Sequence, residues 1–410
     1  MNRFNNYWKK GGQFRPIRIQ YKIMTLHPRL TVNVFGRPIH SFHFFGVVGF
    51  ILGSVLGVAL GELTGLDRAV ILVMSLAGAT TFFLLTMLFK IFTGKEKIVY
   101  YHHEIAILLV CSLVLAIWHK PILPYIDITL LGIATFLAFG RIGCFSVGCC
   151  HGKPGKIGVI YSHDHVKEGF PYYYKGIKIF PVQLVESSFV FIVVAGGTIL
   201  ISNGAAPGTV LTVYTVLYGA FRFIIEFFRG DHERAYFRGL SEAQWTTLLL
   251  IAISVVFAFT GVVPYYEWHM VVAFLLLGFS FYLVGRYDMR EKLISARHVK
   301  QIAIGLHRLN YSNLEKYDLE HLPNGDIDTF QTDYGLIMSG GLLSTDGFIM
   351  RHYTLSCKND SQLTFPLVQK LAVVIKQLEN HPPGFEIAEK ESGVFHILFK
   401  VSPASSAFFS

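Results

Sequence analysis

Charged residues are scarce in this sequence. They account for 15% of its 410 residues, whereas an ordinary soluble domain carries roughly 25%. Residues 44–61 and 244–262 contain none, and each stretch is close to the ~20 apolar residues that cross the hydrocarbon core of a bilayer. This scarcity excludes a water-soluble fold for residues 44–286 and predicts a multi-pass membrane protein.

Alternation of apolar and polar residues is also missing from these stretches. Their apolar runs are unbroken, which excludes a transmembrane β-barrel and predicts helices. We expect a polytopic α-helical membrane protein with seven to eight transmembrane helices. The third predicted span is short, so a buried or re-entrant segment is the alternative to a full crossing there. The spans are expected at residues 44–61, 69–90, 105–118, 124–140, 183–202, 208–228, 244–262 and 268–285.

The N-terminal region lacks a short apolar core followed by a small-residue cleavage site, which excludes a cleavable signal peptide. Its eight Lys and Arg residues predict a basic arm at 1–43 that stays on the mature protein. The five cysteines are an odd number, and one of them lies inside a predicted span. Such usage argues against a disulfide framework.

The composition changes after residue 286 and becomes mixed and polar. Apolar residues of 366–380 recur at helical spacing, and segments 339–348 and 389–395 resemble turns between extended runs. A small soluble α+β domain is therefore predicted at the C-terminus, without a motif that indicates its role. The expected division of the chain is a basic arm at 1–43, a transmembrane domain at 44–290 and a soluble domain at 291–410.

The loops between eight spans sort into two faces of very different charge. One face, which includes the N-terminus and the loop after the fourth span, carries 25 Lys and Arg, and the other carries only Arg68 and Lys120. The positive-inside rule places the basic face in the cytoplasm. The alternative is that this face binds an anionic lipid headgroup, since Lys and Arg hold phosphates by charge-assisted hydrogen bonds.

The sixth predicted span carries charges inside an apolar helix. Its polar residues follow one another at spacings of four, four and three, which places them along one helical face; they are Tyr218, Arg222, Glu226 and Arg229. We expect Arg222 and Glu226 to pair, leaving Tyr218 and Arg229 to reach a ligand. An ion pair that only stabilises the bundle is the alternative. Arginine grips two phosphate oxygens at once, so we favour a phosphoester ligand.

The fourth predicted span ends in a glycine-rich stretch that includes Gly140, Arg141, Gly143, Gly152 and Lys153. Backbone N–H groups of tight turns, next to fixed cations, form a cradle for phosphate. Close helix packing is the alternative reason for the glycines.

Cys144, Cys149, Cys150 and His151 follow in the same stretch. Thiolate and imidazole are the usual zinc ligands. Adjacent cysteines do not easily occupy two corners of one tetrahedron, however, and no CxxC pair is present. We therefore expect packed small thiols, with no metal and no other cofactor.

Two further segments bring polar residues to the basic face. His102, His103 and Glu104 lie near the start of the third span, and Gln183 and Glu186 begin the fifth. Imidazole is the side chain best suited to exchange a proton near neutral pH, although a pair of interfacial histidines is an equal alternative. We expect these segments to meet in one site at the membrane surface.

In order and spacing, three of these segments resemble the prolipoprotein diacylglyceryl transferases, bacterial membrane enzymes that lipidate lipoprotein precursors. The similarity covers residues 38–262. Its strongest parts are 140-GRIGCF-145 with Gly148 and Gly152, 181-PVQLVE-186, and 218-YGAFRFIIEFFR-229. The agreement of all three is more specific than any one of them.

The sequence also departs from the pattern of that family. Cys144 and Cys149 stand where the family has an asparagine and a glutamate, Phe45 replaces the tyrosine of an early Tyr-Gly pair, and His102-His103 lacks the glycines of a His-Gly-Gly segment. These departures identify a divergent member with a Cys-Cys signature loop. The eighth span and the C-terminal domain have no counterpart in the family core.

The resemblance implies transfer of a diacylglyceryl group from phosphatidylglycerol to a cysteine thiol of a lipoprotein precursor signal peptide, with release of glycerol phosphate. It also implies a multi-pass location in the bacterial inner (cytoplasmic) membrane, contact with membrane lipids and no nucleic-acid partner. The alternatives are a non-catalytic protein that binds or transports anionic lipid, and a transferase that uses another acceptor.

The same resemblance assigns roles to the candidate residues. Arg141 and Arg222 would stabilise the leaving phosphate, Glu226 would hold Arg222, and His102 or His103 would take the thiol proton. Further substrate-binding positions are Tyr218, Arg229, Gly140, Gly143, Gly152, Gln183, Glu186 and Lys153.

The orientation of the protein is where charge counting and resemblance disagree. The positive-inside rule puts the basic face in the cytoplasm, whereas the resemblance puts it outside, where exported precursors arrive. We follow the resemblance, because some of the basic residues have a role in the site. An even number of spans then carries the C-terminal domain to the same side as the site.

Overall fold

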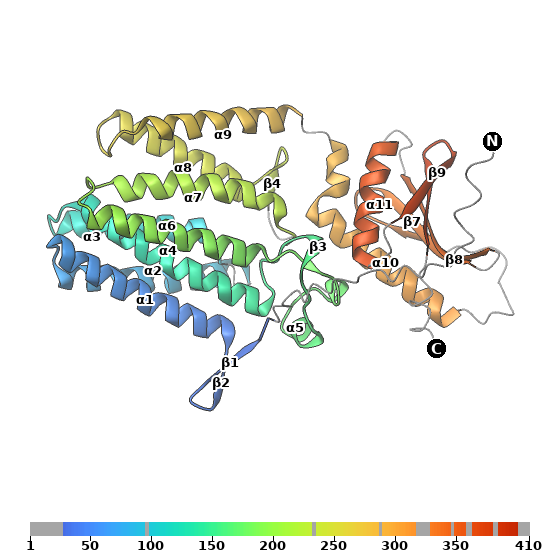
Figure 1. Ribbon diagram of the computed structural model, residues 1–410, viewed down its shortest axis with the longest axis horizontal. Coiled ribbons are helices and arrows are strands. Elements are labelled where there is room, and N and C mark those ends of the chain that lie inside the picture. Colours follow the sequence, from blue (N-terminus) through green and yellow to red (C-terminus); the bar gives the residue numbers. More distant parts are fainter. Residues whose placement is uncertain are drawn as a thin grey trace, which may run out of the picture.

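The computed structural model has a bundle of long helices at one end and a mixed α/β unit at the other (Figure 1). It describes residues 28–94, 98–231, 235–286, 289–316, 329–345, 348–357, 363–379 and 384–400. The basic residues of the predicted arm before position 28 lie outside these ranges.

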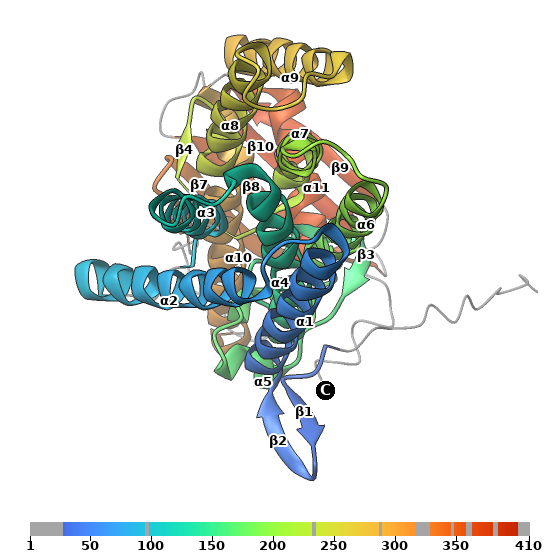
Figure 2. The same cartoon turned by 90° about the vertical axis from the view of Figure 1, so that its left-hand side faces the viewer.

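Eight helices in the described residues are long and apolar enough to cross a membrane, which confirms a multi-pass membrane protein. The helices are α1 (Ser41–Thr64), α2 (Arg68–Thr93), α3 (Tyr100–Ile117), α4 (Ile122–Val147), α6 (Val182–Ser202), α7 (Thr209–Ile225), α8 (Glu242–Phe259) and α9 (Glu267–Gly285). A short 3₁₀ segment, η2 (Glu226–Phe228), continues α7. Seen along the bundle, α4 lies between α1, α3, α6 and α7 (Figure 2), and it packs against each of them.

The third helix is longer than its apolar run predicted. It begins at Tyr100 instead of residue 105, and Tyr101, His103 and Glu104 in its first turns are buried against other helices. Hydropathy reports contact with lipid, and it does not recognise polar residues that are buried by protein. The third segment is thus long enough to be a full crossing.

A row of glycines on α1 sets its distance from α4. Gly49 and Gly53 are buried in this contact, and a Cβ atom on Gly53 would lie 2.6 Å from the carbonyl oxygen of Gly132. The backbones of the two helices therefore approach closely, as small residues at four-residue spacing allow in membranes.

We expect Gly53→Ala to destabilise the bundle by about 1–3 kcal/mol, because the added methyl group meets backbone that cannot rotate away. Gly46→Ala is the matched control on the same helix, since nothing lies within 4 Å of the position that its Cβ would take. Thermal unfolding of both variants in detergent measures the difference. Equal midpoints would contradict the close helix contact.

Short elements connect the helices. The described part of the predicted N-terminal arm contains a hairpin of β1 and β2. Helix α1 follows it and begins at Ser41, before the predicted residue 44. The short elements are β1 (Thr31–Val34), β2 (Arg37–His40), β3 (Pro154–Val159), α5 (His163–Lys167), η1 (Tyr172–Tyr174), β4 (Tyr236–Phe237) and β5 (Leu240–Ser241).

The C-terminal region is an α+β unit, as predicted. Its five antiparallel strands lie in the order β6-β7-β8-β10-β9. On β7, β8 and β10, alternate residues such as Met338, Tyr353 and Ile397 are buried on one face against two helices. The elements are η3 (Met289–Ile294), α10 (Ala296–Lys316), β6 (Thr329–Gln331), β7 (Leu336–Thr345), β8 (Phe348–Cys357), α11 (Phe365–Glu379), β9 (Phe385–Glu391) and β10 (Val394–Lys400).

The predictions within this unit had mixed outcomes. The helix expected at 366–380 is confirmed as α11, and the turn expected at 389–395 lies at Gly393, which has φ +78°. The prediction of a turn over 339–348 was wrong for its first part, because residues 339–345 belong to β7; residues 346 and 347 lie outside the described ranges. Helix α10 was not predicted.

The C-terminal unit packs against the segment between α4 and α6. Tyr161, Phe170 and Tyr174 of that segment belong to the same buried cluster as Leu371 and Phe399 of the C-terminal unit. Figure 1 shows β3 and α5 between the bundle and the α10–α11 pair. The unit is therefore on the same side as the loop that follows the fourth membrane helix, as an even number of spans predicted.

Candidate functional site

The carboxylate of Glu186, near the start of α6, is fully buried among three arginines. Its Oε2 lies 3.0 Å from Nε of Arg141 on α4 and 3.8 Å from Nη1 of Arg229, and its Oε1 lies 3.8 Å from Nε of Arg222 on α7. The three arginines are 6%, 1% and 3% exposed in that order. The structure confirms that these segments, which are far apart in the sequence, meet.

The predicted pair within the sixth span is present. Nη1 of Arg222 lies 2.9 Å from Oε2 of Glu226, one helical turn later. The prediction that Arg229 continues the same helical face was wrong, because the helix has ended and Arg229 has an extended backbone with ψ 139°. Arg229 instead forms an isolated antiparallel bridge with Gly152.

Tyr218 and Arg229, which were expected to reach a ligand, each have a partner within the protein. The Tyr218 hydroxyl donates a hydrogen bond of 2.9 Å to Oε1 of Glu186. Arg229 donates two bonds to Asp231, from Nε to Oδ1 (2.9 Å) and from Nη2 to Oδ2 (3.1 Å). Nη1 of Arg229, 3.8 Å from Oε2 of Glu186, is buried and makes no hydrogen bond within the described ranges.

Asp231 is a site residue that sequence reasoning missed. With Glu186 and Glu226 it gives three carboxylates, which balance the three arginines. The only signal in the sequence was its position two residues after Arg229 at the end of the motif. The pairing lowers the cost of burying so many charges in one place.

The glycine-rich loop is tied to two other segments by backbone hydrogen bonds. Lys153 N donates to Phe228 O (2.9 Å), Gly230 N donates to His151 O (3.0 Å), and Phe180 N donates to Lys153 O (3.0 Å). A Cβ atom on Gly152 would lie 2.3 Å from Phe180 O. At Gly152, therefore, glycine is required for close backbone approach.

The other predicted substrate-binding positions differ in their surroundings. Gly143 lies against the backbone of Phe42 at the start of α1, so the alternative reading, helix packing, applies there. No atom lies within 4 Å of the Cβ position of Gly140, and Lys153 is exposed. Gln183 is buried, and its Nε2 donates to Cys149 O at 2.9 Å, which fixes the loop to the start of α6.

The two candidate histidines have their partners away from the arginines. Nε2 of His102 lies 2.9 Å from Oε1 of Glu242 on α8. In buried His103, Nδ1 donates to Val99 O at 2.8 Å, and Nε2 lies 3.1 Å from Thr86 Oγ1 on α2. Among the described residues neither imidazole makes an ion pair or hydrogen bond with the arginine cluster.

Tyrosines connect α3 to the cluster instead. The rings of Tyr100 and Tyr101 pack edge-on against Tyr218, and the hydroxyls of Tyr100 and Tyr214 lie 2.6 Å apart. Glu104, also buried, interacts with this hydroxyl pair. From the sequence, Glu104 was expected only as a neighbour of the histidines at the start of the third span.

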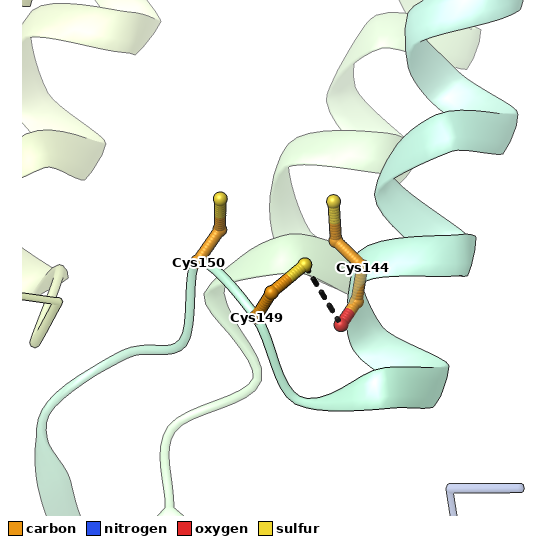
Figure 3. Close-up of side chains that lie close together, drawn as sticks. All are labelled: Cys144, Cys149 and Cys150. Carbon is orange, nitrogen blue, oxygen red and sulfur yellow. Dashed lines mark hydrogen bonds between the residues drawn. The ribbon is translucent and has the colours of Figure 1, made fainter. Parts of the chain in front are cut away.

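Three cysteines converge beside the arginines. The sulfurs of Cys144, Cys149 and Cys150 all lie within 4.8 Å of one another, close enough to hold a metal ion (Figure 3). Adjacent cysteines were not expected to occupy two corners of one tetrahedron easily; here Cys150 has a left-handed backbone with φ +53°, and its sulfur lies near those of Cys144 and Cys149. Cys149 is exposed, Cys150 half-buried and Cys144 buried.

His151 is not part of the sulfur group. Burial lowers the pKa of its imidazole, and the neutral ring donates from Nδ1 to Gly152 O at 2.8 Å. The ring also packs edge-on against Phe170 and Tyr174. Its position therefore stabilises the loop and its contact with the segment under the C-terminal unit.

Known proteins with similar sequences fall in one family. The profile of the family described as prolipoprotein diacylglyceryl transferase matches residues 30–260. Phosphatidylglycerol–prolipoprotein diacylglyceryl transferases of Clostridium tetani and Dehalococcoides mccartyi are 34% and 32% identical over 136 and 132 residues. These alignments cover 33% and 32% of this chain and 52% and 49% of those proteins, so the chain spans about half the length of the curated relatives it matches.

Proposed function

The chain belongs to the prolipoprotein diacylglyceryl transferase family, and on that premise we propose that it transfers a diacylglyceryl group from phosphatidylglycerol to a cysteine thiol of a lipoprotein precursor. The reaction releases glycerol phosphate and forms a thioether. Its setting is the bacterial inner membrane, and its partners are the lipid, the signal peptide of the precursor and the surrounding membrane lipids.

The observation that carries this proposal is the arginine cluster around Glu186. Breaking the bond between the glycerol carbon and the phosphate oxygen leaves negative charge on that phosphate. Arginines fixed in a water-poor site stabilise such charge as it develops. Arg229 supports this role, because its buried Nη1 makes no hydrogen bond within the described ranges, and each guanidinium has five N–H donors.

The remaining residues have positioning and proton-transfer roles in this proposal. Glu186 and Glu226 hold the guanidinium groups of Arg141 and Arg222, and Tyr218 orients Glu186. Of the two imidazoles proposed as proton acceptor, His102 has the better support. It is partly exposed and is held by Glu242, and a carboxylate that orients an imidazole is a common arrangement of a general base.

The test is an assay of purified full-length protein with phosphatidylglycerol vesicles and a precursor peptide that contains one cysteine. We expect thioether-linked lipid on the peptide, and a rate reduced by about 100-fold or more in Arg222→Ala, as for loss of one stabilising donor elsewhere. Arg68→Ala is the matched control, since Arg68 is exposed on the opposite face of the membrane and pairs with Glu62. Its rate is expected to be unchanged.

Two outcomes would overturn the proposal. One is the absence of thioether product under conditions in which an active family member forms it. The other is binding of phosphatidylglycerol that depends on Arg222 without any reaction, which would identify a lipid-binding protein. Product on a hydroxyl or on a different thiol would keep the lipid donor and change the acceptor.

We also propose the division of the chain into an arm at 1–43, a transmembrane domain at 44–290 and a soluble domain at 291–410. In the orientation proposed here, the site and the soluble domain face away from the cytoplasm. Single cysteines at exposed Ser162 and Ser392, in a background without native cysteines, report this orientation. We expect both to react with a membrane-impermeant thiol reagent in intact spheroplasts. If neither cysteine reacts until the membrane is opened, the site and the soluble domain face the cytoplasm, as the positive-inside rule predicts.

A further inference from the structure

We propose that Cys144, Cys149 and Cys150 bind one zinc ion, whose fourth coordination position receives the thiol of the acceptor cysteine. The role of the acceptor rests on the proposed function. The metal site itself rests on the geometry of the three cysteines alone.

The sulfurs already lie near the spacing of metal ligands. All three are within 4.8 Å of one another, and three sulfurs on a tetrahedral zinc with bonds of ~2.3 Å are about 3.8 Å apart. In Figure 3 the side chains of Cys144 and Cys150 extend in the same direction, with Cys149 between them. Small side-chain rotations bring the sulfurs to metal-ligand distance.

The backbone of the loop is arranged to bring these sulfurs together. Gly148 ends α4 with φ +84°, and Cys150 has φ +53°. The left-handed region is unfavourable for a residue with a Cβ atom, and such residues persist where the surrounding structure fixes them, often at functional sites. The hydrogen bonds of His151 and Lys153 to Gly230 and Phe228 provide this fixation.

Three protein ligands leave one position of a tetrahedral zinc for water or substrate, as in catalytic zinc sites. Among the described residues, no histidine or carboxylate joins the three sulfurs, and His151 directs Nδ1 to a backbone carbonyl. Cys149 is exposed, so the site is accessible from outside the protein. A substrate thiol can therefore reach the fourth position.

Zinc would act on the thiol directly, beside the arginines, whereas His102 in the proposed function only takes up the proton that the thiol releases. A thiol that coordinates zinc loses its proton, and the thiolate is the reactive nucleophile. The thiolate sulfur then forms a bond to the glycerol carbon, and the carbon–oxygen bond breaks with its electron pair leaving on the phosphate oxygen. The thiol proton is taken up by His102 or by solvent, and the ion returns to its three-thiolate state.

The arrangement of charges fits this sequence of steps. Arg141 lies one turn before Cys144 on α4, and both Arg141 and Arg229 act electrostatically on the sulfur of Cys150. Three thiolates and one zinc ion carry a net charge of −1, which these cations stabilise. Both arginines belong to the cluster around Glu186 that is proposed to stabilise the leaving phosphate.

The test is the metal content of the full-length protein purified in detergent with a reductant that does not bind metal. Elemental (inductively coupled plasma) mass spectrometry is expected to find one zinc ion per chain. We expect this zinc to be lost in Cys144→Ser and in Cys150→Ser. Cys111→Ser and Cys357→Ser are matched controls, because both of these buried cysteines lie outside the sulfur cluster. Zinc that is absent from the unmodified protein, even after addition of zinc salt, would overturn the proposal. So would a disulfide within the cluster that persists in the reductant.

Cobalt substitution provides a second measurement that needs no variant. The cobalt form is expected to show intense sulfur-to-cobalt absorption in the near ultraviolet, and a peptide with one cysteine is expected to change the visible bands, whereas the same peptide with serine is not. Cobalt bound without sulfur absorption would contradict the ligand set. No response to the cysteine peptide would contradict the open fourth position.

The metal measurements are independent of the transfer assay. Zinc bound by the three cysteines in a protein that makes no thioether product would refute the proposed function and leave the metal site intact. Full transferase activity after complete removal of zinc by a chelator would refute the role of zinc and leave the function intact.

Discussion

Glu186→Gln is expected to cost about 3–5 kcal/mol of stability, because loss of one partner leaves a buried charge without compensation. The side chain of Glu186 is 0% exposed and lies next to three arginines. Glutamine keeps the shape and removes the charge. The cluster would then hold three arginines and two carboxylates, and Tyr218 would lose a charged acceptor.

Thermal unfolding in detergent measures the loss, and the peptide assay is expected to show no detectable product. Glu62→Gln is the matched control, since the Glu62 side chain is 50% exposed and its pair with Arg68 is at the surface; exposed pairs contribute about 0–1 kcal/mol. Adding Arg141→Met to Glu186→Gln restores the charge balance, so it is expected to recover part of the stability without activity. Equal unfolding midpoints for Glu186→Gln and the wild type would contradict the electrostatic account of the cluster.

Gly230→Ala is expected to reduce activity by about 100-fold, the size of effect that a misplacement of about 1 Å can produce in an active site. A Cβ atom at this position would lie 2.3 Å from Gly152 O and 2.7 Å from Gly152 C. These are backbone atoms, so the loop has to move away. Movement of the loop breaks the bridge between Gly152 and Arg229 and displaces the guanidinium from Glu186.

Gly155→Ala is the control for this substitution. It lies in the same loop region, and its Cβ would have an ordinary contact of 3.6 Å with Ile157 O. We expect it to insert, unfold and react as the wild type does. If Gly230→Ala reacts at the wild-type rate, the position of Arg229 does not depend on the loop contact.

The membrane helices were predictable because lipid selects for long apolar runs, whatever the helices pack against. The boundaries were less predictable where a helix end is buried by protein. The polar first turns of α3, with His103 and Glu104, show this. Hydropathy treats these residues as loop, although neighbouring helices cover them.

The meeting of Arg141, Glu186 and Arg222 was predictable from motif order, since each motif lies at the same membrane face. What could not be read from the sequence depends on backbone conformation. Arg229 leaves the helical face because α7 ends before it, and Cys150 joins Cys144 because of a left-handed turn. Spacing rules assume regular backbone and fail at such places.

Because the buried cluster beneath the site loop includes residues as late as Phe399, the order of synthesis matters for this protein. The ribosome makes the arginines, the cysteines and all eight membrane helices before the last strand of the C-terminal sheet. Tyr161 and Tyr174 therefore have no complete partner surface while the chain is still growing. We expect the site loop of the newly inserted bundle to become ordered only after the strand that contains Phe399 has been made and has paired in the sheet.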